Sequence, residues 1–332
     1  MAVVTIADIT KLRKLTGAGM MDCKKALEAS DNDIEKATEI LRQKGQAVAA
    51  KRSDRDASNG CVLVKSTGTF AALVALNCET DFVATNADFV ELTQQIIDAA
   101  VANKCKTVEE VKALKLNDKD TVQDAIVARS GITGEKMELG AYLTVEGESI
   151  AVYNHQGKNI LGTLVAFNKV ADETVAHQIA MQVAAMNPIA IDEDSVSEEI
   201  KEREFKVAVE KTKEEQIEKA VQNALKKAGY NLYIAENEEH IEEGIEKKEI
   251  TQEQADDIRR IKKEVAEQKA ANLPEQMVQN IAKGRMAKFY KEACLVEQED
   301  IMDPSQNIAQ LMAKSDKDLK VTAFQRYTFR AE

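Results

Sequence analysis

Two stretches of the chain share one order of hydrophobic and polar positions. Residues 70–76 form an apolar run that is typical of a buried strand, and residues 86–101 place apolar side chains at helical spacing. Residues 163–168 and 173–186 repeat this strand and helix. The first copy has a longer polar connection, which contains residues 79–82. The pattern therefore predicts a duplicated scaffold in which one copy carries an elaborated loop.

The first 55 residues have the hydrophobic spacing of three short helices. Thr5 begins a capping-box pattern ahead of apolar residues at helical spacing, and a glycine-rich bend follows at 17–19. Residues 21–29 and 34–44 predict two further helices, the last of them ended by Gly45. A bundle of this size buries little surface, so some apolar side chains remain available for a partner.

The remaining segments predict a second sheet and a long helical insertion. Residues 137–168 alternate in short runs between glycines, which favours a three-stranded antiparallel meander, and residues 321–329 favour a strand that returns to it. Residues 195–228 follow a near coiled-coil spacing with intervening Glu and Lys, and a helix that starts at residue 251 runs back. We expect an antiparallel coiled-coil hairpin whose tip lies near residues 229–250.

Together these elements predict an α+β chain in four parts. A polar segment at 47–59 is the expected linker between the helical bundle and the core. Each of two core units is expected to combine an antiparallel sheet with a helix. The expected parts are the three-helix bundle (1–55), the first core unit (56–135), the second core unit (136–192 with 274–332) and the inserted hairpin (193–273).

Composition and charge exclude several classes of function. The 332 residues carry a formal net charge of -12 and the pI is near 5.1, which argues against a general affinity for nucleic acid or an anionic membrane. The chain has no Trp, which leaves few aromatic platforms for base stacking. No apolar run approaches about 20 residues, so no membrane span is expected.

Cysteine and histidine usage points away from disulfide and metal chemistry. The five cysteines are an odd number without a Cys-x-x-Cys motif, and no signal-peptide pattern opens the chain, so we expect reduced thiols in a cytoplasmic protein. The three histidines share no metal-ligand spacing, so no metal site is expected. Residues 131–136 lack the full phosphate-loop pattern and favour a turn.

Two motifs resemble a known protein family. Residues 78–84, Cys-Glu-Thr-Asp-Phe-Val-Ala, resemble the Thr-Asp-Phe signature of the bacterial elongation factor Ts family, and residues 12–27 are similar to its N-terminal signature. The resemblance implies a ubiquitin-associated-like N-terminal bundle. It also implies a guanine-nucleotide exchange factor for elongation factor Tu in the elongation phase of translation. Exchange needs no covalent step, so the resemblance implies no catalytic residue and no cofactor.

The resemblance gives residues 80–83 a specific role. Phe82 is expected to enter between helices of the GTPase elongation factor Tu, while Asp81 approaches the region that holds its Mg²⁺. Thr80 and Val83 are expected to complete this partner-binding loop. From the residues alone, Asp81 is more often a solvated acid and Phe82 a plug for the local core.

The N-terminal bundle and the second core unit add further candidate contacts. Met20 and Met21 lie at the glycine-rich bend, where flexible thioethers suit an adaptable surface, although one of them could instead fill the bundle's core. By resemblance they bind the partner together with Arg13 and Gly19. Gln182 stands where some relatives have a partner-contacting His, and it is a further candidate.

Two functions of other classes compete with exchange. Cys78 could be the nucleophile of a thiol enzyme, although a buried structural cysteine is commoner. The hairpin could instead recruit another protein, which would make the chain a non-catalytic scaffold. In an exchange factor, the hairpin is expected to contact the partner's far domain or a second copy of itself. The second case would give a homodimer or a complex with two copies of each protein.

Overall fold

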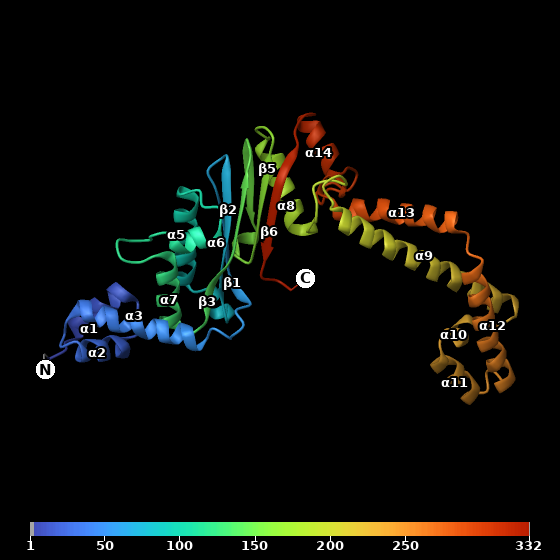
Figure 1. Cartoon of the computed structure of the whole chain (residues 1–332), viewed down its shortest axis with the longest axis horizontal. Coiled ribbons are helices and arrows are strands. Elements are labelled where there is room, and N and C mark those ends of the chain that lie inside the picture. Colours follow the sequence, from blue (N-terminus) through green and yellow to red (C-terminus); the bar gives the residue numbers. More distant parts are fainter. Residues whose placement is uncertain (1–2, 332) are drawn as a thin grey trace. The chain divides into compact units, whose positions relative to one another are not determined.

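Three helices form the N-terminal bundle. They are α1 (Ile6–Thr16), α2 (Met20–Ala29) and α3 (Ile34–Lys51) (Figure 1). The structure, a computed structural model, describes residues 3–331. The expected capping box is confirmed, because Thr5 caps α1 and exchanges hydrogen bonds with Asp8. A small core that includes Leu12 and Leu27 holds the helices together.

The prediction that Gly45 ends the third helix is wrong. α3 continues through Gly45 to Lys51, and Gly45 is the point where it crosses α7 (Val122–Thr133). A Cβ atom built on Gly131 of α7 would lie only 2.4 Å from the Cα atom of Gly45. Glycine is present at this crossing because two backbones approach without room for a side chain. The expected linker at 47–59 is therefore helical in its first part, and α3 joins the bundle to the core.

Two three-stranded antiparallel sheets form the core of the same compact unit. Both sheets keep their strands in sequence order (Figure 1). The first contains β1 (Asn59–Ser66), β2 (Phe70–Cys78) and β3 (Met137–Glu146). The second contains β4 (Ser149–Asn154), β5 (Leu161–Phe167) and β6 (Val321–Thr328).

The prediction of a three-stranded meander over residues 137–168 is wrong. β3 pairs with β2 of the first sheet, with Leu143 opposite Leu73, so only β4 and β5 of this stretch enter the second sheet. The return of the C-terminal strand is confirmed, because β6 pairs with β5. The first sheet thus takes its third strand from beyond residue 135, where the sequence pattern placed the boundary between the core units. Pairing between strands so far apart in the chain leaves no local signal in the sequence.

The two sides of β2 pack against different layers, because successive side chains of a strand point to opposite faces. One face packs under α5 (Ala87–Ala102), and the other packs against the second sheet. The first face presents Ala72, Val74 and Leu76, and the second presents Ala71, Leu73 and Ala75. α6 (Val108–Ala113) and α7 join the cluster around α5.

The duplication expected from the sequence is present in the structure. α8 (Glu173–Met186) packs on β4 and β5 as α5 packs on the first sheet, and the Thr163 hydroxyl donates to the Ala180 carbonyl at 2.9 Å. The connection between β2 and α5 contains the extra helical turn α4 (Asp81–Ala84), which has no counterpart between β5 and α8. α14 (Ile308–Ser315) packs on α8 before the chain enters β6.

Residues 192–298 form a second compact unit made of helices. As expected, α12 (Gln252–Ala271) returns along α9 (Glu198–Lys227), but the return arm then breaks near Pro274 and continues as α13 (Glu275–Ala293), which also packs on α9. Arg285 of α13 donates to the Thr212 hydroxyl of α9 at 3.0 Å, so α13 belongs to the hairpin rather than to the second sheet. The helices are α9 (Glu198–Lys227), α10 (Leu232–Ala235), α11 (Glu238–Glu246), α12 (Gln252–Ala271) and α13 (Glu275–Ala293).

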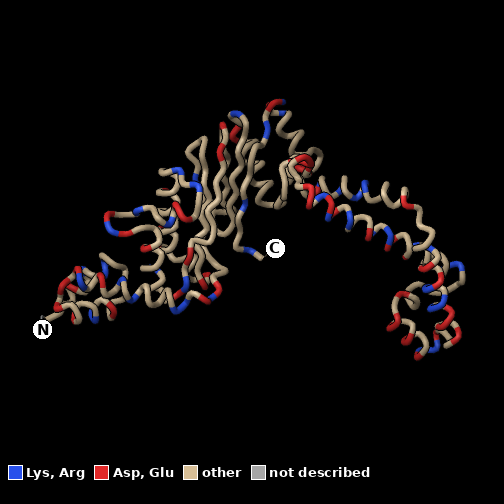
Figure 2. Tube along the Cα trace, viewed as in Figure 1, with Lys and Arg blue, Asp and Glu red and all other residues tan. Residues whose placement is uncertain are grey.

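The tip of the hairpin has a small apolar core of its own. Leu225, Ile241 and Ile258 are buried together there, and Arg259 binds Glu238 and Glu242 across the surface. Acidic and basic residues are interspersed along the hairpin helices (Figure 2). Within the described residues, no helix is long and apolar enough to cross a membrane.

Candidate functional site

The segment at residues 80–84, here called the Phe82 turn, is a capped helical turn rather than an irregular loop. Thr80 is the N-cap of α4, and its hydroxyl oxygen accepts from the Val83 amide at 3.4 Å. Ala84 is buried and Val83 packs against the first core, while Asp81 is exposed. The two ends of the turn are thus anchored, and its first residues face outward.

Phe82, the aromatic residue of this turn, is largely exposed, with 82% of its surface accessible. The alternative that it plugs the local core is therefore contradicted. Burying a Phe side chain stabilises a protein by roughly 1.5–3 kcal/mol, and Phe82 leaves that stabilisation unused in the free protein. An exposed aromatic on an anchored turn has the properties of a residue that binds inside another protein.

Glu135 anchors the Phe82 turn, and this role leaves no local signal in the sequence because Glu135 lies 55 residues away from Thr80. One carboxylate oxygen of Glu135 accepts from the amides of Glu79 and Thr80, both at 3.1 Å. The other oxygen accepts from the Thr80 hydroxyl at 2.7 Å. Residues 131–136 form the end of α7 and a turn at Gly134, as expected, and this turn places Glu135.

Glu79 makes the reciprocal connection. Its carboxylate accepts from the Lys136 amide at 2.6 Å and from Arg52 at 2.9 Å. The hydrogen bond from the Lys136 amide and the guanidinium of Arg52 lower the pKa of Glu79, so this carboxylate is ionised at neutral pH. Arg52 follows the last residue of α3, which links the Phe82 turn to the N-terminal bundle.

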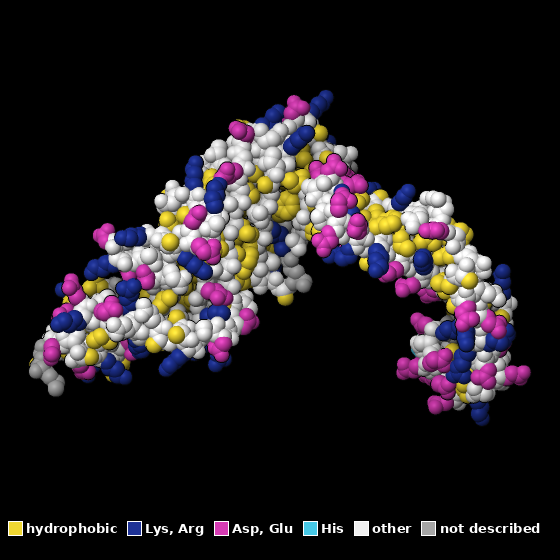
Figure 3. All heavy atoms as spheres, in the orientation of Figure 1, with side chains coloured by type: hydrophobic (Ala, Val, Ile, Leu, Met, Phe, Trp, Pro, Cys, Tyr) yellow, Lys and Arg dark blue, Asp and Glu magenta, His cyan; other side chains and the backbone are white. Residues whose placement is uncertain are grey.

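The bundle exposes the residues that the sequence proposed as partner contacts. Gly19 is the N-cap of α2, and Met20 and Met21 fill its first turn with 48% and 62% of their surfaces accessible. Neither methionine belongs to the bundle's core, so the alternative that one of them fills it is contradicted. Arg13 is exposed in the last turn of α1, close in sequence to the exposed Leu15. Figure 3 shows apolar side chains on the surface of this bundle.

Gln182, which the sequence analysis proposed as a partner contact, is buried. Its side chain has no accessible surface. The amide nitrogen donates to the Glu299 carbonyl at 3.0 Å, and the amide oxygen accepts from the Ile301 amide at 3.0 Å. A side chain enclosed in this way ties α8 to the segment after residue 298 and cannot touch a partner in this structure.

Cys78 lacks the properties of a nucleophile. It is fully buried, its thiol donates to the Thr80 carbonyl at 3.2 Å, and burial raises its pKa to about 12. A thiol must ionise before it attacks, so Cys78 is unreactive at neutral pH. All five cysteines are buried. Over residues 3–331, no group of His, Cys, Asp or Glu side chains is arranged to hold a metal ion.

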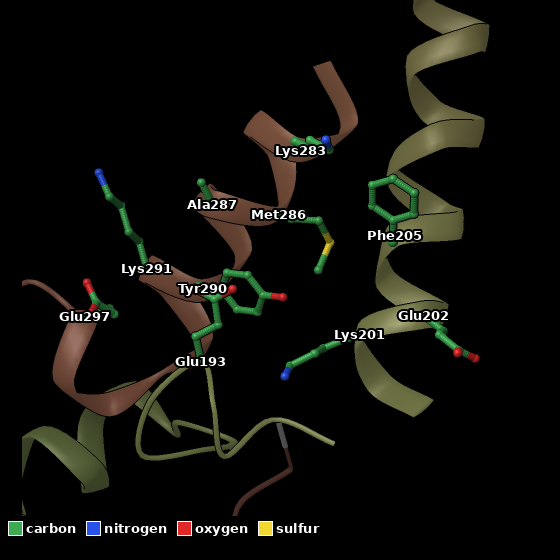
Figure 4. A pocket seen from close by; sticks show the side chains of 10 residues that line it. All are labelled: Glu193, Lys201, Glu202, Phe205, Lys283, Met286, Ala287, Tyr290, Lys291 and Glu297. Carbon is green, nitrogen blue, oxygen red and sulfur yellow. The ribbon is translucent and has the colours of Figure 1, made fainter. Parts of the chain in front are cut away.

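A cavity of about 660 Å³ lies in the hairpin unit between α9 and α13. Phe205, Met286 and Tyr290 form its apolar wall, with Lys201 beside them (Figure 4). The hydrogen bond to Glu198 raises the pKa of Lys201, which favours its protonated form. The cavity is a groove lined by both apolar and charged side chains.

Comparison with known proteins identifies the family. The model of a family described as "Elongation factor TS" matches residues 79–237 and 242–331, and a model described as "Elongation factor Ts, mitochondrial, N-terminal" matches residues 2–49. The chain belongs to the elongation factor Ts family. Curated elongation factor Ts proteins of Bacteroides thetaiotaomicron and Bacteroides fragilis are 62% and 61% identical to it over 329 residues, which cover 99% of each chain. That of Porphyromonas gingivalis is 43% identical over the same share.

As a member of the elongation factor Ts family, the protein is a translation elongation factor. The exposed methionines lie within the N-terminal match, and the Phe82 turn lies at the start of the longer one. The hairpin also falls within the family match, apart from residues 238–241 at the start of α11.

Proposed function

We propose that this protein is a guanine-nucleotide exchange factor for elongation factor Tu. The single observation that carries the proposal is the exposure of Phe82 on a turn whose two ends are anchored, with the Asp81 carboxylate beside it. An enzyme would need an activated group, whereas an exchange factor needs a rigid projection that enters its partner. The Phe82 turn has the second property.

The exchange mechanism follows from how a GTPase holds its nucleotide. Backbone amides, a Lys and Mg²⁺ bind the phosphates. Phe82 enters between helices of the partner and shifts them, while the carboxylate of Asp81 disturbs the region of the Mg²⁺ ion. The nucleotide then loses part of its electrostatic binding, and GDP leaves. GTP refills the empty site and displaces the factor, so no covalent step and no cofactor take part.

The N-terminal bundle supplies the second contact in this proposal. Met20 and Met21 provide adaptable apolar surface, and Arg13 adds a charge next to them. The first sheet delivers the Phe82 turn, and the second sheet unit adds contact area. The hairpin contacts either the partner's far domain or a second copy of the chain. The reaction takes place in the cytoplasm, where translation proceeds.

Thermodynamic linkage provides the test. If this protein binds the empty form of elongation factor Tu best, then GDP and this protein must each weaken the binding of the other, and the two affinities must fall by the same ratio. We expect the affinity of this protein for elongation factor Tu of the same organism, measured by calorimetry, to fall steeply as GDP is added. An affinity that GDP leaves unchanged would show that the protein binds as a scaffold and would refute exchange.

A further inference from the structure

We propose that Glu135 and Glu79 are positioning residues, which hold the Phe82 turn in the conformation that performs exchange. This inference rests on the proposed exchange function for its effect on activity. Its structural part, a brace between two loops, can be judged without the partner. The proposed role requires no contact between either carboxylate and the partner. Both carboxylates accept hydrogen bonds from groups within the protein.

The Phe82 turn cannot hold itself in place. α4 has four residues, and an isolated helical turn of this length is unstable because nucleation costs more than one hydrogen bond returns. The Thr80 hydroxyl that caps the turn donates a hydrogen bond to the Glu135 carboxylate at 2.7 Å. The same carboxylate accepts the Thr80 amide, so Glu135 fixes the cap from two directions. The capped conformation of α4 therefore depends on a residue from another part of the chain.

The two loops bind each other reciprocally. Glu135, after α7, accepts the amides of Glu79 and Thr80, while Glu79, after β2, accepts the amide of Lys136. Arg52 closes the arrangement by binding both oxygens of Glu79 at 2.9 Å. Hydrogen bonds to ionised groups are stronger than those between neutral groups, so each of these hydrogen bonds to a carboxylate makes the two loops more rigid. The Phe82 turn is thereby fixed to α7, β3 and the end of α3.

Rigidity of this kind increases the effect of an inserted side chain. A flexible loop must be ordered when it binds, and that ordering lowers the affinity for the partner. A turn that is already ordered loses little entropy when it binds, so more of its contact energy is available to shift the helices between which it inserts. Loss of the brace should therefore reduce exchange even though Asp81 and Phe82 themselves are unchanged.

Amide hydrogen exchange of the free protein tests the brace directly. In Glu135→Ala, we expect the amides of Glu79 and Thr80 to exchange at least about tenfold faster, because they lose a charged acceptor. Glu135→Gln should give a smaller increase, since its amide oxygen can still accept. The control Glu148→Ala removes an exposed carboxylate of the same unit and should leave these amides unchanged. Unchanged exchange in Glu135→Ala would overturn the proposal.

A double-mutant cycle tests the role in activity. GDP release from elongation factor Tu should slow about tenfold in Glu135→Ala with Phe82 present, whereas adding Glu135→Ala to Phe82→Ala should cause little further slowing. Full additivity, or normal release in Glu135→Ala, would overturn the positioning role. If the unmodified protein fails to accelerate release, the proposed function fails, and amide exchange alone still decides whether the brace exists.

Discussion

Gly131→Ala is expected to separate α3 from α7, and the neighbouring substitution Gly45→Ala is not. The two glycines face each other at the helix crossing that attaches the N-terminal bundle to the core. A Cβ atom on Gly131 would lie 2.4 Å from Cα and 3.2 Å from the nitrogen of Gly45. A Cβ atom on Gly45 would lie no closer than 3.3 Å to any atom, the nearest being the Val127 carbonyl oxygen.

The difference between the two distances determines the expected energies. Carbon atoms in contact prefer separations of about 3.5–4.0 Å, so Gly131→Ala must move two backbones apart by about 1 Å. Overpacking of this kind costs about 1–3 kcal/mol, and the greater helix propensity of Ala returns about 0.5–1 kcal/mol. We expect a net loss of about 1–2 kcal/mol in the free energy of unfolding for Gly131→Ala. For Gly45→Ala the small crowding and the gain in propensity nearly cancel, and the change should stay below about 1 kcal/mol.

Urea unfolding followed by circular dichroism at 222 nm measures both variants, and amide hydrogen exchange across α3 and α7 shows where stability is lost. Gly131→Ala should lower the midpoint and speed exchange in both helices, because the bundle is attached through this crossing. Equal effects of the two substitutions, or a Gly131→Ala protein as stable as the unmodified one, would refute the close approach of the helices.

Three further predictions concern other parts of the chain. Gln182→Leu should lower the free energy of unfolding by about 1–3 kcal/mol, measured by urea unfolding, because the Glu299 carbonyl and the Ile301 amide lose their hydrogen bonds to the Gln182 side chain. The pKa of Glu79 lies below its ordinary value of 4.5, so its stabilisation is present above that pH and is lost as the pH falls below it. Thermal unfolding of Glu79→Gln should accordingly depend less on pH in the acid range than that of the unmodified protein, and equal dependence would contradict the lowered pKa. Replacing residues 217–281 by a linker of about six Gly and Ser residues keeps the contact of Arg285 with α9. GDP release should survive this replacement if the Phe82 turn carries exchange, and its loss would favour a scaffold that works through the hairpin.

Local features of this fold could be predicted from the sequence. The capping box at Thr5, the strand and helix of each core copy and the arms of the hairpin all leave periodic patterns or caps in consecutive residues. The longer connection in the first copy also pointed to the Phe82 turn. These features share one property, which is that neighbours in the sequence decide them.

The errors concern contacts between distant segments. Gly45 looks like a helix end in the sequence, but it lies inside α3, where Gly131 of another helix packs against its backbone. β3 was assigned to the wrong sheet because its alternation fits either partner, and only the packed fold selects β2. Glu135 and the burial of Gln182 likewise depend on contacts across 55 and 117 residues. Such contacts have no signature in a single sequence.

Release of a fluorescent GDP from elongation factor Tu, at saturating Mg²⁺, tests the central claim most directly. The unmodified protein should accelerate release, and Phe82→Ala should lose about 10- to 100-fold of that acceleration, which corresponds to the burial of one Phe side chain. Tyr233→Ala removes another exposed aromatic, on the hairpin, and Cys78→Ala removes a buried thiol next to the Phe82 turn. Both controls should retain more activity than Phe82→Ala. Equal losses in all three variants, or no acceleration by the unmodified protein, would contradict exchange through Phe82.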